Sequence, residues 1–146
     1  MNSSKNIFLI EDDEDDQMFF TECIAKIDNA TLSDVATNGR EAIEKLEKSE
    51  TLPDMIFMDI NMPFMNGIDC LKEIKNNPRT KNISVVMLST DTSQAQETRI
   101  IGAKAFIKKP SDFEKLKAKV KQMINLDFII DFQVADQTFL MEYVNN

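Results

Sequence analysis

KNIFLIEDDEDD, residues 5–16, is the stretch from which the fold of this chain can be worked out. Four apolar residues, 7–10, run directly into six consecutive acidic residues, 11–16. A short apolar run that stops at a polar boundary is typical of a buried strand. Because carboxylates repel one another and favour water, we expect the acidic residues at the edge of a sheet, where this strand ends.

Outward from this strand, the spacing of apolar residues alternates between strand-like and helical. Four further strands are predicted, over residues 31–36, 54–59, 83–90 and 105–110. Helices are predicted between and after them, over residues 16–27, 38–50, 68–77, 93–103 and 111–124. Pro78 ends the third helix, and Ser111 with Glu114 is expected to form a capping box at the start of the last. Five strand–helix units in a row predict an α/β fold, a doubly wound parallel sheet with helices on both faces.

The composition indicates one globular domain. With 146 residues, 42% of them hydrophobic, the chain is long enough to bury a core. Its net charge of −8 argues against binding to nucleic acid, which needs clustered Lys and Arg side chains. No apolar run is long enough to span a membrane, and acids follow residues 7–10 at once, so we expect no signal peptide and a cytoplasmic location. Cys23 and Cys70 are too few for a disulfide scaffold, and the absence of His excludes histidine-based catalysis within the chain.

In such a sheet, ligands bind outside the carboxyl ends of the strands. The residues that follow the predicted strands are therefore candidates for a site: Glu11, Asp12, Asp13, Asp59, Asn61, Ser89, Thr90, Asp91, Lys109 and Pro110. Carboxylates from two strand ends need a cation, and hard oxygen ligands suit Mg²⁺ or Mn²⁺. A nearby Lys and a Ser hydroxyl suit phosphoryl oxygens, and an Asp within reach of both can attack phosphorus as a nucleophile.

The remaining acids, Glu14, Asp15 and Asp16, fall at the first turn of the predicted helix. The helix macrodipole favours acidic side chains there, so we do not expect them to be ligands. An EF-hand is a poor alternative, because this loop lacks the Gly and Glu that an EF-hand requires at its sixth and twelfth positions.

Four motifs at strand ends, in this order, carry a resemblance to a known family: Glu11-Asp12, DINMPFMNG (59–67), LST (88–90) and KKP (108–110). Over about residues 5–124 the chain resembles the response-regulator receiver domain of two-component signalling, and is similar to the chemotaxis response regulators. This resemblance implies a flavodoxin-like (βα)5 sheet with strand order 2-1-3-4-5.

The resemblance also implies the roles of the site residues. Asp59 would be the phosphoacceptor, and Lys109 and Ser89, with the neighbouring Thr90, would contact the phosphoryl group. The ligands of Mg²⁺ or Mn²⁺ would be Glu11, Asp12, Asp59 and the backbone carbonyl of Asn61.

Two further positions match those that govern switching and phosphoryl lifetime in the family. Phe106 matches the aromatic switch position, although plain core is an alternative interpretation. Because Phe lacks a hydroxyl, coupling between Phe106 and Ser89 would be steric. Asn61 and Asp91 match the positions that tune attack by water on the acyl phosphate, and this polar–acidic pair predicts a short-lived phosphate.

The implied function is that of a stand-alone receiver. It would accept a phosphoryl group from a histidine kinase or phosphotransfer protein, in a Mg-dependent reaction, and change conformation over residues 90–103. It would catalyse only its own phosphorylation and dephosphorylation, and would signal through contacts with a downstream protein. The receiver would span residues 1–126. The tail, 127–146, is too short and acidic for a DNA-binding domain, and we expect a short helix packed on the receiver or at a homodimer interface.

Three rival functions fit the sequence less well. A phosphatase of the haloacid-dehalogenase type needs a second Asp two residues after its nucleophile, where this chain has Asn61. A flavodoxin-like electron carrier needs a hydroxyl- and Gly-rich phosphate loop after the first strand, where this chain has six acids that would repel the phosphate. A degenerate receiver would lack part of the site, and here the full set is present. Near Asp59, the apolar Met62, Phe64 and Met65 are either core residues or contacts for a partner.

Overall fold

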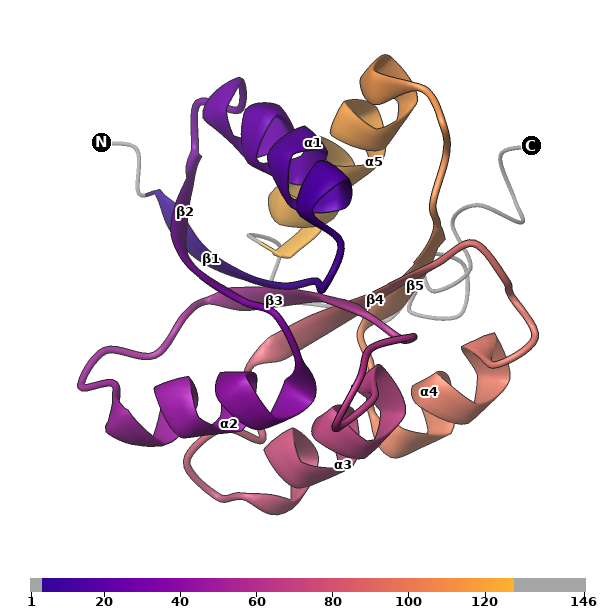
Figure 1. Ribbon diagram of the computed structural model, residues 1–146. Helices are drawn as coiled ribbons and strands as arrows, with labels where there is room; N and C mark the ends of the chain where they lie inside the picture. Colours follow the sequence, from indigo (N-terminus) through magenta and orange to yellow (C-terminus); the bar gives the residue numbers. More distant parts are fainter. Residues whose placement is uncertain (1–3, 128–146) are drawn as a thin grey trace.

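Five parallel strands form one sheet in the order β2-β1-β3-β4-β5 (Figure 1). The computed structural model describes residues 4–127. The strands are β1 (Lys5–Ile10), β2 (Ala30–Ala36), β3 (Met55–Asp59), β4 (Ser84–Ser89) and β5 (Ala105–Lys108). The helices are α1 (Glu14–Ala25), α2 (Gly39–Lys48), α3 (Gly67–Asn76), α4 (Ala95–Ile101) and α5 (Phe113–Asp127). The predicted fold class and strand order are therefore confirmed.

The helices cover the sheet on both faces, α1 and α5 on one and α2, α3 and α4 on the other (Figure 1). Successive residues of the buried central strand β3 alternate between two apolar layers. Met55 and Phe57 face α1 and α5, whereas Ile56 and Met58 face the other three helices. Cys23 and Cys70 are both buried, one in each layer, as expected for small apolar residues.

Side chains cap the starts of the helices. Asp13, Asn38 and Asn66 each accept a hydrogen bond from the backbone N–H three residues later, at the starts of α1, α2 and α3. At α5, Asp112 Oδ1 accepts from the backbone N–H of Glu114 at 2.8 Å. The predicted capping box of Ser111 and Glu114 is therefore wrong. The later start suits the apolar face of α5, because it lets Phe113 pack edge-on against Phe19 of α1.

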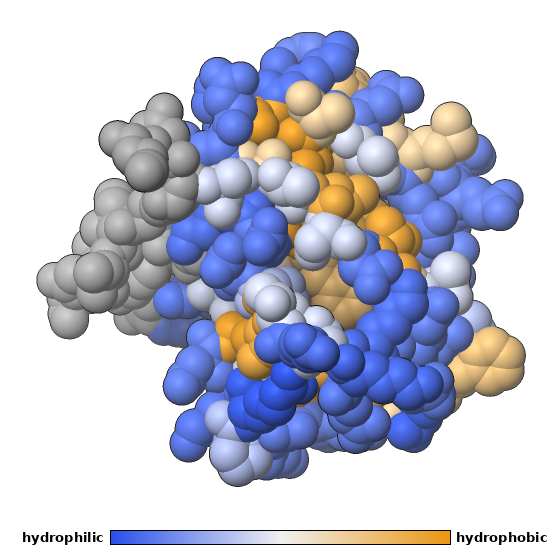
Figure 2. Space-filling view, turned by 90° about the vertical axis from the view of Figure 1, so that its left-hand side faces the viewer, coloured by the Kyte–Doolittle hydropathy of each residue, from blue (hydrophilic) through white to orange (hydrophobic). Residues whose placement is uncertain are grey.

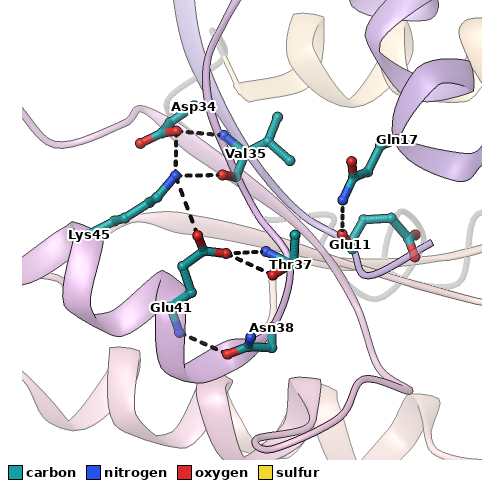
Figure 3. Close-up of polar contacts among 8 residues, drawn as sticks. All are labelled: Glu11, Gln17, Asp34, Val35, Thr37, Asn38, Glu41 and Lys45. Carbon is teal, nitrogen blue, oxygen red and sulfur yellow. Dashed lines mark hydrogen bonds and ion pairs between the residues drawn. The ribbon is translucent and has the colours of Figure 1, made fainter. Parts of the chain in front are cut away.

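The edge strand β2 is tied to α2 by a polar network (Figure 3). Lys45 of α2 donates to the carbonyl of Val35 at 2.7 Å and to Asp34 Oδ1 at 2.9 Å. Glu41 accepts from the backbone N–H of Thr37, and this bond lowers the pKa of its carboxyl below the ordinary value. On this side of the molecule a band of apolar surface separates polar regions (Figure 2).

The predicted tail lies outside the described residues apart from Asp127, which ends α5, so the domain boundary and the tail helix stay predictions. Within residues 4–127, no helix combines the length and the apolar character needed to cross a membrane.

Candidate functional site

The carboxyl ends of four strands meet at one edge of the sheet. Backbone hydrogen bonds extend the ladder just past the strands: Ile60 N–H donates to the Leu88 carbonyl at 3.2 Å, and Lys109 N–H donates to the Ser89 carbonyl at 2.8 Å. Glu11 follows β1, Asp59 ends β3, and Lys109 follows β5. Residues far apart in the sequence are therefore brought together by strand pairing alone.

Lys109 lies among three carboxylates. Its Nζ is 2.8 Å from Glu11 Oε1, 3.0 Å from Asp59 Oδ1 and 3.0 Å from Asp16 Oδ2. The side chain of Lys109 is 18% exposed, and those of Glu11 and Asp59 are 2% and 8% exposed. Ion pairs between groups this buried are screened by solvent much less than surface pairs are.

Burial governs the protonation of these groups. It raises the pKa of Glu11 to about 7, although the hydrogen bond from Lys109 acts in the opposite direction. Burial likewise raises the pKa of Asp59 above its ordinary value, again opposed by Lys109. Burial disfavours the charged form of Lys109, but the bond to Glu11 and the charge of Asp59 outweigh it and raise the pKa of Lys109. The ammonium is therefore firmly charged, and it offsets only part of the negative charge around it.

Glu11, Asp12 and Asp59 fit a divalent cation. Each of them offers one carboxylate oxygen, and these atoms all lie within 4.8 Å of one another. Oxygen ligands of this kind suit Mg²⁺ and Mn²⁺. The raised pKa values of Glu11 and Asp59 show that their charges are costly in this setting, which a bound cation would offset. Asp12 is exposed, so this side of the group is open to solvent.

Other predicted site residues lie at the same edge. Ser89 is buried, and its hydroxyl oxygen accepts a hydrogen bond from the Asp91 N–H at 3.1 Å. The carboxylate of Asp91 accepts from the backbone N–H and hydroxyl of Ser93, which lowers its pKa. Thr90 is exposed and lines a cavity of about 420 Å³ together with Lys109. Asn61 is exposed in the loop after β3.

Phe106 lies inside the protein. Its ring is 1% exposed and belongs to the apolar layer that faces α2, α3 and α4. This position agrees with the interpretation of Phe106 as a core residue. If Phe106 also has the switch role, its ring already points inward in this structure.

Asp16 contacts Lys109, which the sequence does not predict. The sequence predicts Asp16 only in the first turn of the helix, where it does lie, yet its carboxylate pairs with Lys109. The signal was helical spacing: Asp16 stands four residues before the buried Phe20 and eight before the buried Ile24, on the apolar side of α1. An acid in line with an apolar stripe lies at the border of the buried face, so the half-exposed Asp16 can reach Lys109.

Gly67 is a second residue without a predicted role. Its N–H donates to the Ile60 carbonyl at 2.8 Å, which brings the start of α3 against the end of β3. A Cβ at this position would lie 2.4 Å from the Asp59 carbonyl oxygen and 2.8 Å from Ile60 Cα. Only glycine allows this approach, so Gly67 fixes the backbone that carries Asp59.

Phe64, in the loop between Asp59 and α3, has a strained backbone. Its φ is +66°, and its side chain is 91% exposed. The left-handed region disfavours a residue with a Cβ by about 1–2 kcal/mol, and Asn tolerates it better. We expect Phe64→Asn to raise the free energy of unfolding by about 1 kcal/mol, measured by urea denaturation. Phe64→Ala removes the same ring but keeps a disfavoured φ, so it is the matched control, and equal effects of the two substitutions would contradict the strain.

The comparisons with known proteins agree with this geometry. The model of the response regulator receiver domain matches residues 7–121, more than half of the chain. The chain belongs to the response-regulator receiver family. Chemotaxis protein CheY of Thermotoga maritima is 40% identical to it over 109 residues, which cover 73% of this chain and 86% of that protein. Receivers are signalling domains of two-component systems, and they interact with histidine kinases and other targets.

Solved receiver structures share the fold. The phosphorylated cyanobacterial phytochrome response regulator RcpA matches with a TM-score of 0.73 and 28% identity, over 83% of this chain and 91% of that chain. The CheX-CheY-BeF3-Mg²⁺ complex from Borrelia burgdorferi matches with a TM-score of 0.73 and 29% identity, over 84% of this chain and 90% of that chain. Several other curated relatives are longer, and the chain spans only 15% to 50% of their length.

Proposed function

We propose that this receiver accepts a phosphoryl group on Asp59, in a reaction that depends on Mg²⁺ or Mn²⁺. The observation that carries the proposal is the position of the Asp59 carboxylate. It is buried at the end of β3, 3.0 Å from the Lys109 ammonium, and shares with Glu11 and Asp12 an arrangement of oxygens that fits a cation.

In the proposed transfer, a carboxylate oxygen of Asp59 attacks the phosphorus of a phosphohistidine on the donor protein. The P–N bond breaks, and its electron pair leaves with the imidazole nitrogen. Lys109 offsets negative charge on the phosphoryl oxygens, which is the main way in which proteins promote this transfer. A bound divalent cation would supply further positive charge beside the same oxygens, held by Glu11, Asp12, Asp59 and the Asn61 carbonyl.

Ser89 and Thr90 are the proposed hydroxyl groups of the site. The Ser89 oxygen accepts from the Asp91 N–H, so the hydrogen of its hydroxyl is available to a phosphoryl oxygen. Thr90 follows directly. Asn61 and Asp91 are proposed to tune attack by water on the aspartyl phosphate, and the short lifetime expected from the sequence stays a prediction.

The proposed conformational change involves residues 90–103 and Phe106. Within this segment α4 has only 7 residues, and its N-cap, Gln94, makes no side-chain capping bond. A short helix with a poor cap rearranges at low free-energy cost, which supports its role as the element whose equilibrium phosphorylation shifts.

The proposed partners are a histidine kinase or phosphotransfer protein, which donates the phosphoryl group, and a downstream protein, which binds the conformation that phosphorylation favours. The homodimer expected from the tail depends on residues outside the described part of the chain. The cytoplasmic location also stays a prediction from the sequence.

The test is time-resolved mass spectrometry of the full chain with phosphoramidate and Mg²⁺. We expect a gain of one phosphoryl group that depends on the cation, and tandem mass spectrometry should assign it to the peptide that holds Asp59. No gain with phosphoramidate or with any candidate kinase would overturn the proposal and favour a degenerate receiver.

Replacement of Asp12 tests the candidate metal ligands. We expect Asp12→Asn to abolish Mg²⁺ binding in isothermal titration calorimetry, because it removes one of the three convergent carboxylates. Asp15→Asn makes the same change of charge three residues along the chain, at an exposed position in the first turn of α1, and should leave Mg²⁺ binding nearly unaltered. Equal losses in the two variants would mean that the acidic stretch attracts Mg²⁺ only through its overall charge.

A further inference from the structure

The Lys109 ammonium is fully engaged in this structure. An ammonium has three N–H donors, and Nζ lies within 3.0 Å of three separate carboxylates, those of Glu11, Asp59 and Asp16. Glu11 and Asp59 belong to the group of oxygens that fits a divalent cation, and Asp16 lies outside that group. Among the partners of Lys109 in residues 4–127, Asp16 is therefore the one that would neither bind the cation nor accept the phosphoryl group.

Asp16 is held in place by α1 rather than by the sheet. Its backbone N–H donates to Asp13 Oδ2, the capping side chain, at 2.9 Å. The next residue, Gln17, donates to the Glu11 carbonyl, which anchors the first turn of α1 to the end of β1 (Figure 3). The Asp16 side chain is 46% exposed, compared with 2% for Glu11. The backbone at Asp16 is thus fixed, and its carboxylate reaches Lys109 from the solvent side of the site.

We propose that Asp16 is a positioning residue that keeps the Lys109 ammonium in place beside Asp59 while Glu11 and Asp59 serve other partners. This inference rests on the proposed phosphoacceptor function. A cationic side chain next to a divalent cation is repelled by it, and coordinated carboxylates attract the ammonium less. The Asp16 carboxylate supplies the attraction that remains, and so directs Lys109 toward the oxygens of the incoming phosphoryl group.

Asp16 could position Lys109 or could act only as a negative charge. These two roles predict opposite changes in the phosphorylation rate when the Asp16 carboxylate is removed. If Asp16 acted only as a negative charge, Asp16→Asn would speed the reaction with an anionic phosphodonor, because it lowers the repulsion. If Asp16 positions Lys109, the same substitution slows the reaction, because Lys109 is no longer held where the phosphoryl charge develops. Asp15→Asn is the matched control, since Asp15 is exposed and lines the same cavity as Asp16, but makes no ion pair with Lys109.

The first experiment measures the phosphorylation rate of the full chain with phosphoramidate, as a function of donor concentration and at saturating Mg²⁺. We expect Asp16→Asn to lower the maximal rate about fivefold, the loss expected for a partly exposed ion pair, and Asp15→Asn to leave it unchanged or slightly raised. In a Lys109→Gln background, Asp16→Asn should produce no further loss. A rate for Asp16→Asn at or above that of Asp15→Asn, or an equal loss in the Lys109→Gln background, would overturn the inference.

The second experiment measures the Kd for Mg²⁺ by calorimetry and needs no phosphoryl transfer. Without Asp16, Lys109 draws more strongly on Glu11 and Asp59 and competes with the cation. We therefore expect Asp16→Asn to raise the Kd about threefold more than Asp15→Asn does, with no difference between the two in the Lys109→Gln background. The variants could show these differences in Kd while the wild type is never phosphorylated. In that case the proposed function fails and the positioning of Lys109 by Asp16 stands. Equal Kd values for Asp16→Asn and Asp15→Asn would refute the positioning.

Discussion

Asp59→Asn should reduce phosphorylation by phosphoramidate to background. The amide nitrogen and oxygen of Asn are poor nucleophiles, and Asp59 is the acid that the central strand β3 places in contact with Lys109. Mass spectrometry of the intact chain would show the loss directly. Asp28→Asn, an exposed change of the same charge before β2, is the control and should keep the full gain of one phosphoryl group.

The same substitution should raise the stability of the fold at neutral pH. Burial raises the pKa of Asp59 in the folded protein above its ordinary value, so its ionised form is less favourable in the folded than in the unfolded state. A carboxyl with a raised folded pKa contributes stability at low pH, and this contribution is lost as the pH rises through the folded pKa. We therefore expect Asp59→Asn to melt at a higher temperature than wild type at pH 7, and the difference to shrink as the pH falls toward the ordinary pKa of Asp. A lower melting temperature at pH 7 would mean that the ion pair with Lys109 outweighs the burial of Asp59.

Gly67→Ala should damage both stability and phosphoacceptance. Its Cβ would lie 2.4 Å from the Asp59 carbonyl oxygen, so either the start of α3 or the end of β3 must shift. Forcing an atom into a packed site typically destabilises a protein by about 1–3 kcal/mol, and here the displaced atoms belong to the backbone of Asp59, the proposed acceptor. We expect a lower urea midpoint together with a phosphorylation rate at least tenfold below wild type, since small misplacements of reacting groups have large effects.

Ile27→Val is the control for this prediction. Ile27 is buried just after the end of α1, at the opposite edge of the sheet from Asp59 and outside residues 90–103. Removal of one buried methylene costs about 1 kcal/mol, so we expect a loss of stability without a change in the phosphorylation rate. If both variants lost phosphorylation in proportion to stability, Gly67 would have no specific effect on Asp59.

Much of the fold and part of the site could be predicted from the sequence because both depend on periodicity and connectivity. The apolar period of each segment indicated strand or helix, and five alternating units allowed few topologies. Parallel strands end at one edge, so Glu11, Asp59 and Lys109 had to lie near one another once their strands were identified. These are properties of the backbone pattern, which the order of residue types determines.

Other features could not be predicted because neighbouring residues were equally suited to the same local role. Ser111 and Asp112 are both good helix caps, and the packing of Phe113 against Phe19 favoured the second. The first turn of α1 holds three acids, and any of them satisfies the helix dipole. Only the rotation of α1 against the sheet selected Asp16 to face Lys109, and left Asp15 in solvent.

The order of residue types was enough to indicate a receiver, because an acidic pair, an Asp, a hydroxyl and a Lys each follow a strand of a parallel sheet. Strand order then brings these strand ends to one edge. How these groups share charge, in contrast, depends on the packing of the folded chain. It buried Glu11 and Asp59 enough to raise the pKa of each, placed Asp16 as the third partner of Lys109, and set α3 so close to Asp59 that only glycine fits at position 67. Periodicity and connectivity are properties of residues that are near one another in the sequence. Burial, ion pairing and steric fit depend instead on atoms that only folding brings within a few ångströms of one another.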